Sequence, residues 1–178
     1  IRLQRISGGQ PLWGMNGICP INDTEPSDNR LMGLEGDYLA YLRRPLSPGN
    51  VRNLYVLRFN PGDGTAAPAW GSLGKPVAQE DNQPAWYRRL CGFKQVPQGI
   101  MALFTGSSDT LGQCVLAQVF DPEANYLLSP TGELLVTDVY SQDYIQTLMG
   151  EDDITLYWIA DLGDLHSPKL QRFSYALE

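Results

Sequence analysis

The most patterned part of the chain runs from Gln113 to Ala160, where short apolar runs alternate with turn-forming residues. Four runs rich in Val, Leu, Tyr and Thr occur there, at 114–120, 126–128, 133–140 and 154–160. Apolar runs of this length bounded by Pro, Gly, Asp and Asn are typical of antiparallel strands joined by turns. None is long or periodic enough to predict a long helix. The stretch therefore predicts an antiparallel meander.

The length and composition favour a single β-rich domain. The chain has 178 residues, of which 43% are hydrophobic, and both values are ordinary for one globular core. We predict a mainly β fold over residues 1–178, an antiparallel β-barrel or β-sandwich with long Pro/Gly-rich loops and at most one or two short helices. No stretch approaches eighteen consecutive apolar residues, so no membrane insertion is expected.

Further strands are predicted on both sides of the meander. They cover residues 31–44, 51–60, 90–94, 100–104 and 170–177. In the first of these, the predicted buried face holds Leu34, Tyr38, Ala40 and Leu42. Tyr144, Ile145 and Leu148 have helical spacing, with Ser141 as a possible N-cap and Gly150 as a stop, which predicts one short helix over 141–150.

Two long irregular segments are rich in Pro and Gly. Residues 1–30 predict an extended arm over the core, pinned by Trp13. Residues 61–89 predict a long loop insertion, and loops of this length in a compact domain are commonly functional. The insertion contains Trp70 and ends in Trp86-Tyr87-Arg88-Arg89. Aromatic side chains beside arginine are typical of recognition surfaces.

A shorter loop over 105–112 is the second candidate contact surface. The residues proposed to contact a ligand are Trp70, Trp86, Tyr87, Arg88, Arg89, Ser107 and Asp109. The alternative is that the tryptophans fix the insertion onto the core. That alternative is favoured for Trp70, whereas Trp86 fits either role.

Charge and cysteine content exclude several classes of function. The net charge is −7 and the basic residues do not form a stripe, so no nucleic-acid partner is predicted. Cys19, Cys91 and Cys114 include no C-x-x-C pair, and His166 is the only histidine, so neither a metal nor another cofactor is expected. One disulfide with a free thiol and three buried thiols are both compatible with the count, and buried thiols are favoured.

Catalytic patterns are weak. His166 is close in sequence to Asp161 and Asp164, which leaves open a hydrolase that uses aspartate and this histidine. The chain has no G-x-S-x-G motif, and acidic residues in turns are common in any acidic β protein. We therefore predict a protein that is not an enzyme.

The second half of the chain resembles calicivirus-type capsid protruding domains. The strand and Asp-Pro turn of 116–123 are similar to a family strand that ends in an Asn/Asp-Pro-Asp-Thr-Gly-like turn, although Ala124-Asn125 replace Thr-Gly. The segments 132–137 and 156–158 resemble the family's following strand and its closing Trp-bearing strand, and 90–98 is similar to its Cys-Leu-Leu-Pro-Gln stretch. The chain is shorter than a complete domain of this family, so an astrovirus- or hepevirus-like spike fits its length better.

The resemblance implies a non-enzymatic, homodimeric β-barrel spike at the virion surface, in an extracellular setting. Such a domain binds a host cell-surface receptor or glycan and carries antibody epitopes. The ligand-contacting residues of the family lie in variable loops, so none is transferred to this chain. The alternative is a structural subunit or pilin-like head domain of a bacterial surface assembly. The hydrolase that uses His166 is a third hypothesis.

Overall fold

The computed structural model describes residues 1–46, 52–79, 89–108, 112–137, 139–140, 145–150, 153–161 and 166–174. These residues form mostly antiparallel β-strands and almost no helix, which confirms the predicted fold class. Within the described ranges, no helix is long and apolar enough to cross a membrane.

The strands form three larger sheets and one small hairpin. The first sheet has the order β3 (Ser27–Glu35), β4 (Tyr38–Pro45), β5 (Asn53–Arg58), β6 (Lys75–Pro76). The second has the order β10 (Glu133–Val136), β9 (Gly112–Phe120), β8 (Gly99–Ser108), β7 (Leu90–Val96). The third has the order β11 (Gln146–Met149), β12 (Asp153–Asp161), β13 (His166–Ser174). The hairpin pairs β1 (Ile6–Ser7) with β2 (Gln10–Pro11), and a 3-10 helix, η1, spans Pro68–Trp70.

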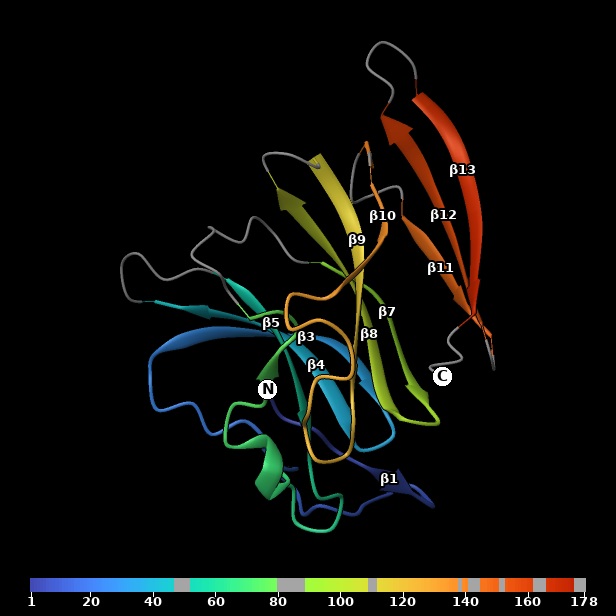
Figure 1. The fold of residues 1–178 in the computed structure, drawn as a ribbon. Coiled ribbons are helices and arrows are strands. Elements are labelled where there is room, and N and C mark those ends of the chain that lie inside the picture. Colours follow the sequence, from blue (N-terminus) through green and yellow to red (C-terminus); the bar gives the residue numbers. More distant parts are fainter. Residues whose placement is uncertain are drawn as a thin grey trace.

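The second sheet is the central layer, and its inner strands β8 and β9 are largely buried on both faces. Along β8, Ile100, Ala102 and Phe104 pack in one core with β4 and β5. The intervening Met101 and Leu103 pack in another core with β12. Figure 1 shows the resulting order, from β3–β5 at lower left, through β7–β10, to β11–β13 at upper right. The fold is therefore a sandwich of three sheets.

Two hairpins depend on glycine at the turn. β3 and β4 are joined by Gly36-Asp37, where Gly36 has a φ of 58°. β7 and β8 are joined by Pro97-Gln98, and the following Gly99 has a φ of 147°. A Cβ atom at Gly99 would lie 2.0 Å from the carbonyl oxygen of Phe120 on β9, so the approach of these strands requires glycine.

The strands predicted at 51–60, 90–94 and 100–104 are confirmed as β5, β7 and β8. Residues 31–44 instead form a hairpin, because the chain reverses at Gly36-Asp37. Tyr38 and Ala40 are buried as predicted, but Leu34 is 52% exposed and Leu42 is half-buried. The single alternating face predicted for this segment was therefore wrong.

The helix predicted over 141–150 was wrong for the residues that the structure describes. Residues 146–149 form β11, in which Leu148 lies opposite Thr155 of β12. This pairing satisfies the backbone and overrides the helical spacing of the apolar residues. Residues 141–144 lie outside the described ranges.

The predicted meander is divided between two sheets. β9 pairs with β10, whereas the strand predicted at 154–160 is β12 in the third sheet. Of the run 126–128, only Tyr126 forms a bridge, opposite Phe120. The chain changes sheet at 139–140, where Val139 donates its N–H to Gln113 of β9 and Tyr140 donates to Ile159 of β12.

Loop boundaries also differ from the expectation. β8 continues to Ser108, so the loop predicted over 105–112 begins later, and 109–111 lie outside the described residues. The closing strand is confirmed as β13, which ends at Ser174, and 175–178 lie outside the described residues.

The arm is pinned by Trp13 as predicted. Its indole N–H donates to the carbonyl of Pro61 at 2.5 Å, and its ring meets Phe59 edge-on.

Burial of the central sheet predicts its contribution to stability. Leu103→Ala removes a side chain that is fully buried between two sheets, and we expect it to lower the free energy of unfolding by about 2–5 kcal/mol. Leu170→Ala is the matched control, because Leu170 is 71% exposed, and we expect a change within about 0.5 kcal/mol. Urea unfolding followed by circular dichroism measures both. Equal losses in the two variants would contradict the double-sided burial.

Candidate recognition surface

An open cleft of about 620 Å³ lies between the N-terminal arm and the 61–79 loop. Its lining comes from two short segments that are far apart in the sequence. These residues are Cys19, Pro20, Ile21, Asn22, Asp63, Gly64, Thr65, Ala66, Ala67, Pro68, Gly71 and Ser72. The N–H of Asn22 donates to the carbonyl of Ser72 at 3.1 Å and joins the two walls. The cleft is thus made by chain segments that meet only in the folded protein.

Trp70 fixes the loop wall of the cleft. It ends η1, is 1% exposed, and packs against Tyr38 and Phe120 with ring centroids 5.7 and 5.5 Å away. Its indole N–H donates to the carbonyl of Pro122 at 3.0 Å. The structure therefore places Trp70 in the core, as the favoured alternative for this residue predicts, and leaves almost none of its side chain for a ligand.

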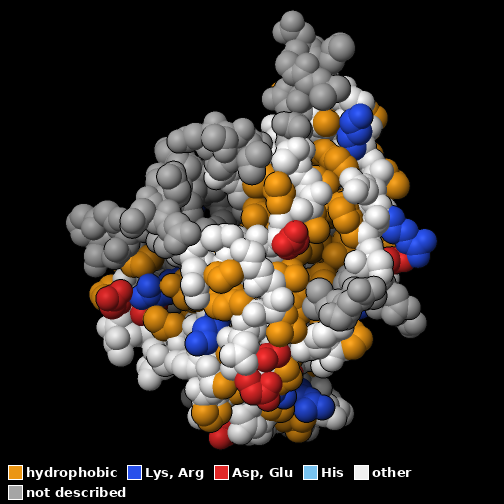
Figure 2. All heavy atoms as spheres, viewed as in Figure 1, with side chains coloured by type: hydrophobic (Ala, Val, Ile, Leu, Met, Phe, Trp, Pro, Cys, Tyr) orange, Lys and Arg blue, Asp and Glu red, His pale blue; other side chains and the backbone are white. Residues whose placement is uncertain are grey.

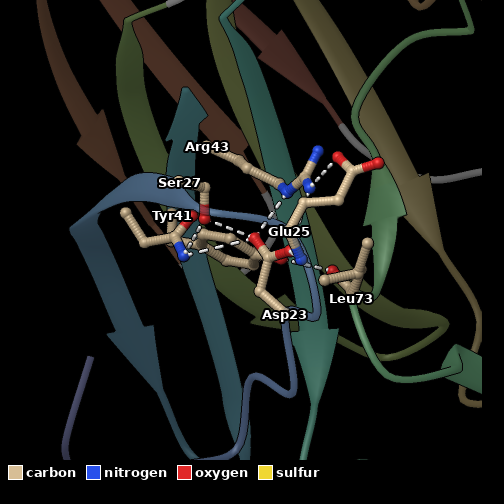
Figure 3. A network of polar contacts seen from close by, with 7 residues as sticks. Asp23, Glu25, Ser27, Tyr41, Arg43 and Leu73 are labelled. Carbon is tan, nitrogen blue, oxygen red and sulfur yellow. Dashed lines mark hydrogen bonds and ion pairs between the residues drawn. The ribbon is translucent and has the colours of Figure 1, made fainter. Parts of the chain in front are cut away.

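A buried ion pair fixes the arm wall (Figure 3). Arg43 of β4 meets Asp23 through two hydrogen bonds of 2.7 and 2.9 Å, and also reaches Glu25 at 3.0 Å. The side chains of Arg43 and Asp23 are 9% and 8% exposed. The hydroxyl of Ser27 donates to Asp23, and the amide of Asn29 donates to Ser27 at 2.8 Å.

This network changes the acidity of Asp23. The hydrogen bonds from Arg43 hold the pKa of the Asp23 carboxyl well below its usual range, with smaller contributions in the same direction from Ser27 and the backbone N–H of Glu25. The hydrogen bonds from Arg43 to the carboxylates of Asp23 and Glu25 in turn raise the pKa of Arg43. Next to the network, the hydroxyl of Tyr41 donates to the carbonyl of Leu73 at 2.5 Å. The arm and the loop are therefore both tied to β4.

The lining favours hydrogen bonding over aromatic stacking. None of the lining residues is aromatic, and Asn22, Asp63, Thr65 and Ser72 supply polar groups among small apolar side chains. The Asp63 carboxylate accepts the backbone N–H and the hydroxyl of Thr65, at 2.9 and 2.7 Å, and these bonds lower its pKa. An ionised carboxylate accepts strongly from hydroxyl donors, so the cleft suits a small polyhydroxyl group.

The other predicted contact residues do not lie at this cleft. Arg89 is exposed just before β7, where its N–H donates to the hydroxyl of Thr105 at 3.0 Å. Ser107 is exposed two residues further along β8. In Figure 1 this end of β8 points to the top of the view, whereas the helical turn η1, which belongs to the loop wall of the cleft, lies near the bottom. The remaining predicted contacts, Trp86, Tyr87, Arg88 and Asp109, lie outside the described residues.

The thiols and the histidine occupy separate places. No two of the cysteines are paired, and they range from buried Cys114 through half-buried Cys91 to exposed Cys19. Burial raises the pKa of Cys91 to about 12 and also raises the pKa of Cys114. Cys19 is exposed and lines the cleft, so the favoured expectation of three buried thiols was wrong for this residue. His166 lies opposite Asp161 in register, with its ring 3.8 Å from that of Tyr140 between centroids.

Comparison with family models, curated proteins and solved structures finds no match to this chain. The residues that the structure describes contain no group of three or more potential metal ligands. No sequence pattern predicted that residues 19–22 form one wall of the cleft. Nothing local marks those residues as a wall, because they become one only where they face residues 63–72.

The Arg43–Asp23 pair predicts a pH-dependent contribution to stability. Asp23→Asn leaves Arg43 buried with Glu25 as its acidic partner among the described residues, so we expect a loss of about 3 kcal/mol at pH 7. The folded-state pKa of Asp23 is lowered, so its stabilisation is present above the unfolded pKa of about 4 and is lost as the pH falls below it. The difference between the wild type and the variant should therefore narrow below about pH 4.

Urea unfolding at pH 7 and at decreasing pH measures this effect. Asp28→Asn is the matched control, because Asp28 is exposed on β3 next to the same network. An Asp23→Asn loss no larger than that of the control, or one that does not vary with pH, would contradict the proposed role of the pair.

Proposed function

We propose that this chain is a non-enzymatic recognition domain of a surface assembly, which binds a receptor or glycan through the cleft between residues 19–22 and 63–72. The observation that carries the proposal is the way the cleft is held. Its loop wall is anchored by Trp70 and its arm wall by the Arg43–Asp23 pair. Rigid walls reduce the entropy lost on binding, and the polar groups between them suit hydroxyl-bearing ligands.

The finer part of the proposal is a host-attachment spike of a viral capsid at the virion surface. Its support is the resemblance of residues 116–123 and 132–137 to protruding domains. Those residues form β9 with its Asp-Pro turn, and β10, which pairs with β9. The turn is closed by Asp121, whose carboxylate accepts the N–H of Asn125 at 2.8 Å. Ala124 takes a positive φ of 66° there, at the position where the family has Thr.

A glycan array and a cell-binding assay with the purified domain test the proposal. Ser72→Tyr introduces a large side chain at the edge of the cleft, and we expect it to weaken binding by at least about tenfold, or ~1.4 kcal/mol. Gln10→Tyr is the control, because it adds the same side chain at an exposed position of β2. No binding by the wild type, or equal binding by both variants, would overturn the proposal.

A structural subunit is the second candidate function, and the outer face of the third sheet favours it. Leu148 and Leu170 are 72% and 71% exposed, and Tyr157 is 37% exposed between them on β12. On the same face, Arg172 forms an ion pair with Asp153, so these two charges compensate each other. Exposed apolar side chains on neighbouring strands are typical of association surfaces. We propose that a second copy of the chain covers this face.

Sedimentation velocity at increasing protein concentration tests the association. We expect the wild type to form dimers, and the double variant Leu148→Ser with Leu170→Ser to remain monomeric, because it removes most of the exposed apolar area. Ile6→Ser is the control, because Ile6 is 68% exposed on β1, away from the third sheet. A wild type that stays monomeric at every concentration would exclude the homodimer.

A further inference from the structure

A groove of about 350 Å³ lies between the central and third sheets, on the side of the central sheet that faces away from the cleft. One wall is formed by residues 134–136 of β10 and by the following Thr137. The other is formed by Trp158 and Ala160 of β12 with Lys169 and Gln171 of β13. Figure 2 shows hydrophobic side chains gathered in this region at the upper right, with basic side chains along β13.

Among the described residues, hydrogen bonds join the two sheets at the side of β7 and β11, and Val139 and Tyr140 connect the start of β9 to the end of β12. At the side of β7 and β11, the ammonium of Lys94 donates to the carbonyl of Met149 at 3.2 Å, and the hydroxyl of Thr147 donates to the carbonyl of Cys91. At the other side, β10 and β13 are the last strands of their sheets among the described residues. No described strand pairs between them, so the sandwich is open there.

Trp158 supplies an unused hydrogen-bond donor in this wall. The residue is 7% exposed, and its indole Nε1 is buried without an acceptor. It shares a face of the third sheet with Lys169, because the two lie opposite each other in the register of β12 and β13. Buried N–H groups are almost always paired, so this donor, on a residue that lines the groove, points to an acceptor that the described residues do not provide.

The charge of the lining defines that acceptor. Among the described residues of the lining, Lys169 is the one that carries a formal charge, and its charge is positive in a chain whose net charge is −7. Gln171 adds an amide donor close by on β13, while Leu134, Val136 and Ala160 make part of the surface apolar. A ligand that matches these groups presents an anionic acceptor to Trp158 and Lys169 and an apolar surface to β10.

We propose that this groove is a second binding site, which takes a carboxylate carried on a partly apolar stem. The carboxylate accepts from the indole N–H of Trp158 and from the Lys169 ammonium, and the stem lies along Leu134 and Val136. An acidic sugar and the C-terminus of a peptide both present this chemistry. The site lies in different layers from the cleft and does not rest on the function proposed for the cleft.

Tryptophan fluorescence and isothermal titration calorimetry with two probes test the site on the whole chain. The methyl glycoside of N-acetylneuraminic acid represents the acidic sugar, and N-acetyl-leucine represents a peptide C-terminus. We expect at least one probe to bind and to change the fluorescence of Trp158, and the tighter probe identifies the source of the carboxylate. The amide of N-acetyl-leucine keeps the stem and lacks the charge, so it should bind at least about tenfold more weakly than the acid.

Two variants separate the contributions of the protein. Trp158→Phe keeps an aromatic ring and removes the N–H, and Lys169→Met keeps an exposed side chain of similar length without the charge. Each should weaken binding of the carboxylate probe by about tenfold, the usual effect of losing a charge-assisted hydrogen bond. Lys75→Met on β6 is the control that should leave this binding unchanged.

Two experimental results would overturn the proposal. The proposal is overturned if the wild type binds neither probe at millimolar concentration. It is also overturned if Trp158→Phe and Lys169→Met both bind the carboxylate probe as tightly as the wild type. Thermal unfolding of each variant checks that the fold is retained. Lys169 is exposed, so its variant keeps the test decisive even if Trp158→Phe unfolds.

Discussion

The structure depends on burial of the central sheet from both sides. Residues 100–105 of β8 are all at most 3% exposed, and their side chains alternate between two cores. A strand buried on both faces has a continuous apolar sequence, and Ile-Met-Ala-Leu-Phe at 100–104 is such a run. Because the hydrophobic effect scales with the apolar area removed from water, this layer couples the first sheet to the third.

The cleft depends on polar contacts made at the margin of the first core. Trp70 brings the 61–79 loop onto Phe120 and the turn after β9, and the hydroxyl of Tyr126 extends the attachment by donating to Pro76 at 2.7 Å. On the arm, the Arg43–Asp23 pair is stabilising only because both charges are compensated and hydrogen-bonded, since an uncompensated buried charge is costly. The groove shows the opposite condition, because the Trp158 donor is buried without a partner.

Strand positions were predictable where turn chemistry and alternation agree, as in β5, β7 and β8. The prediction of a helix over 141–150 failed because one local pattern fits two structures. The apolar spacing around Leu148 is compatible with a helix, but residues 146–149 pair with β12 and form a strand. The candidate site was less predictable. Part of the predicted 61–89 insertion lines the cleft, at residues 63–72, but Arg89 and Ser107 lie at the other end of the sheet, and no local pattern predicted the arm wall.

The amino-acid sequence by itself determined the fold class, because turn residues and short β-branched or aromatic runs act over a few neighbouring positions. It also determined that Trp13 pins the arm, since an isolated large apolar side chain in a polar segment is stabilised by packing against the core. Only the tertiary structure decided which sheet each strand joins and which rings pack against Trp70. It alone brought residues 19–22 to 63–72 and β10 to β13. These outcomes depend on packing between segments distant in the chain, which no local pattern encodes.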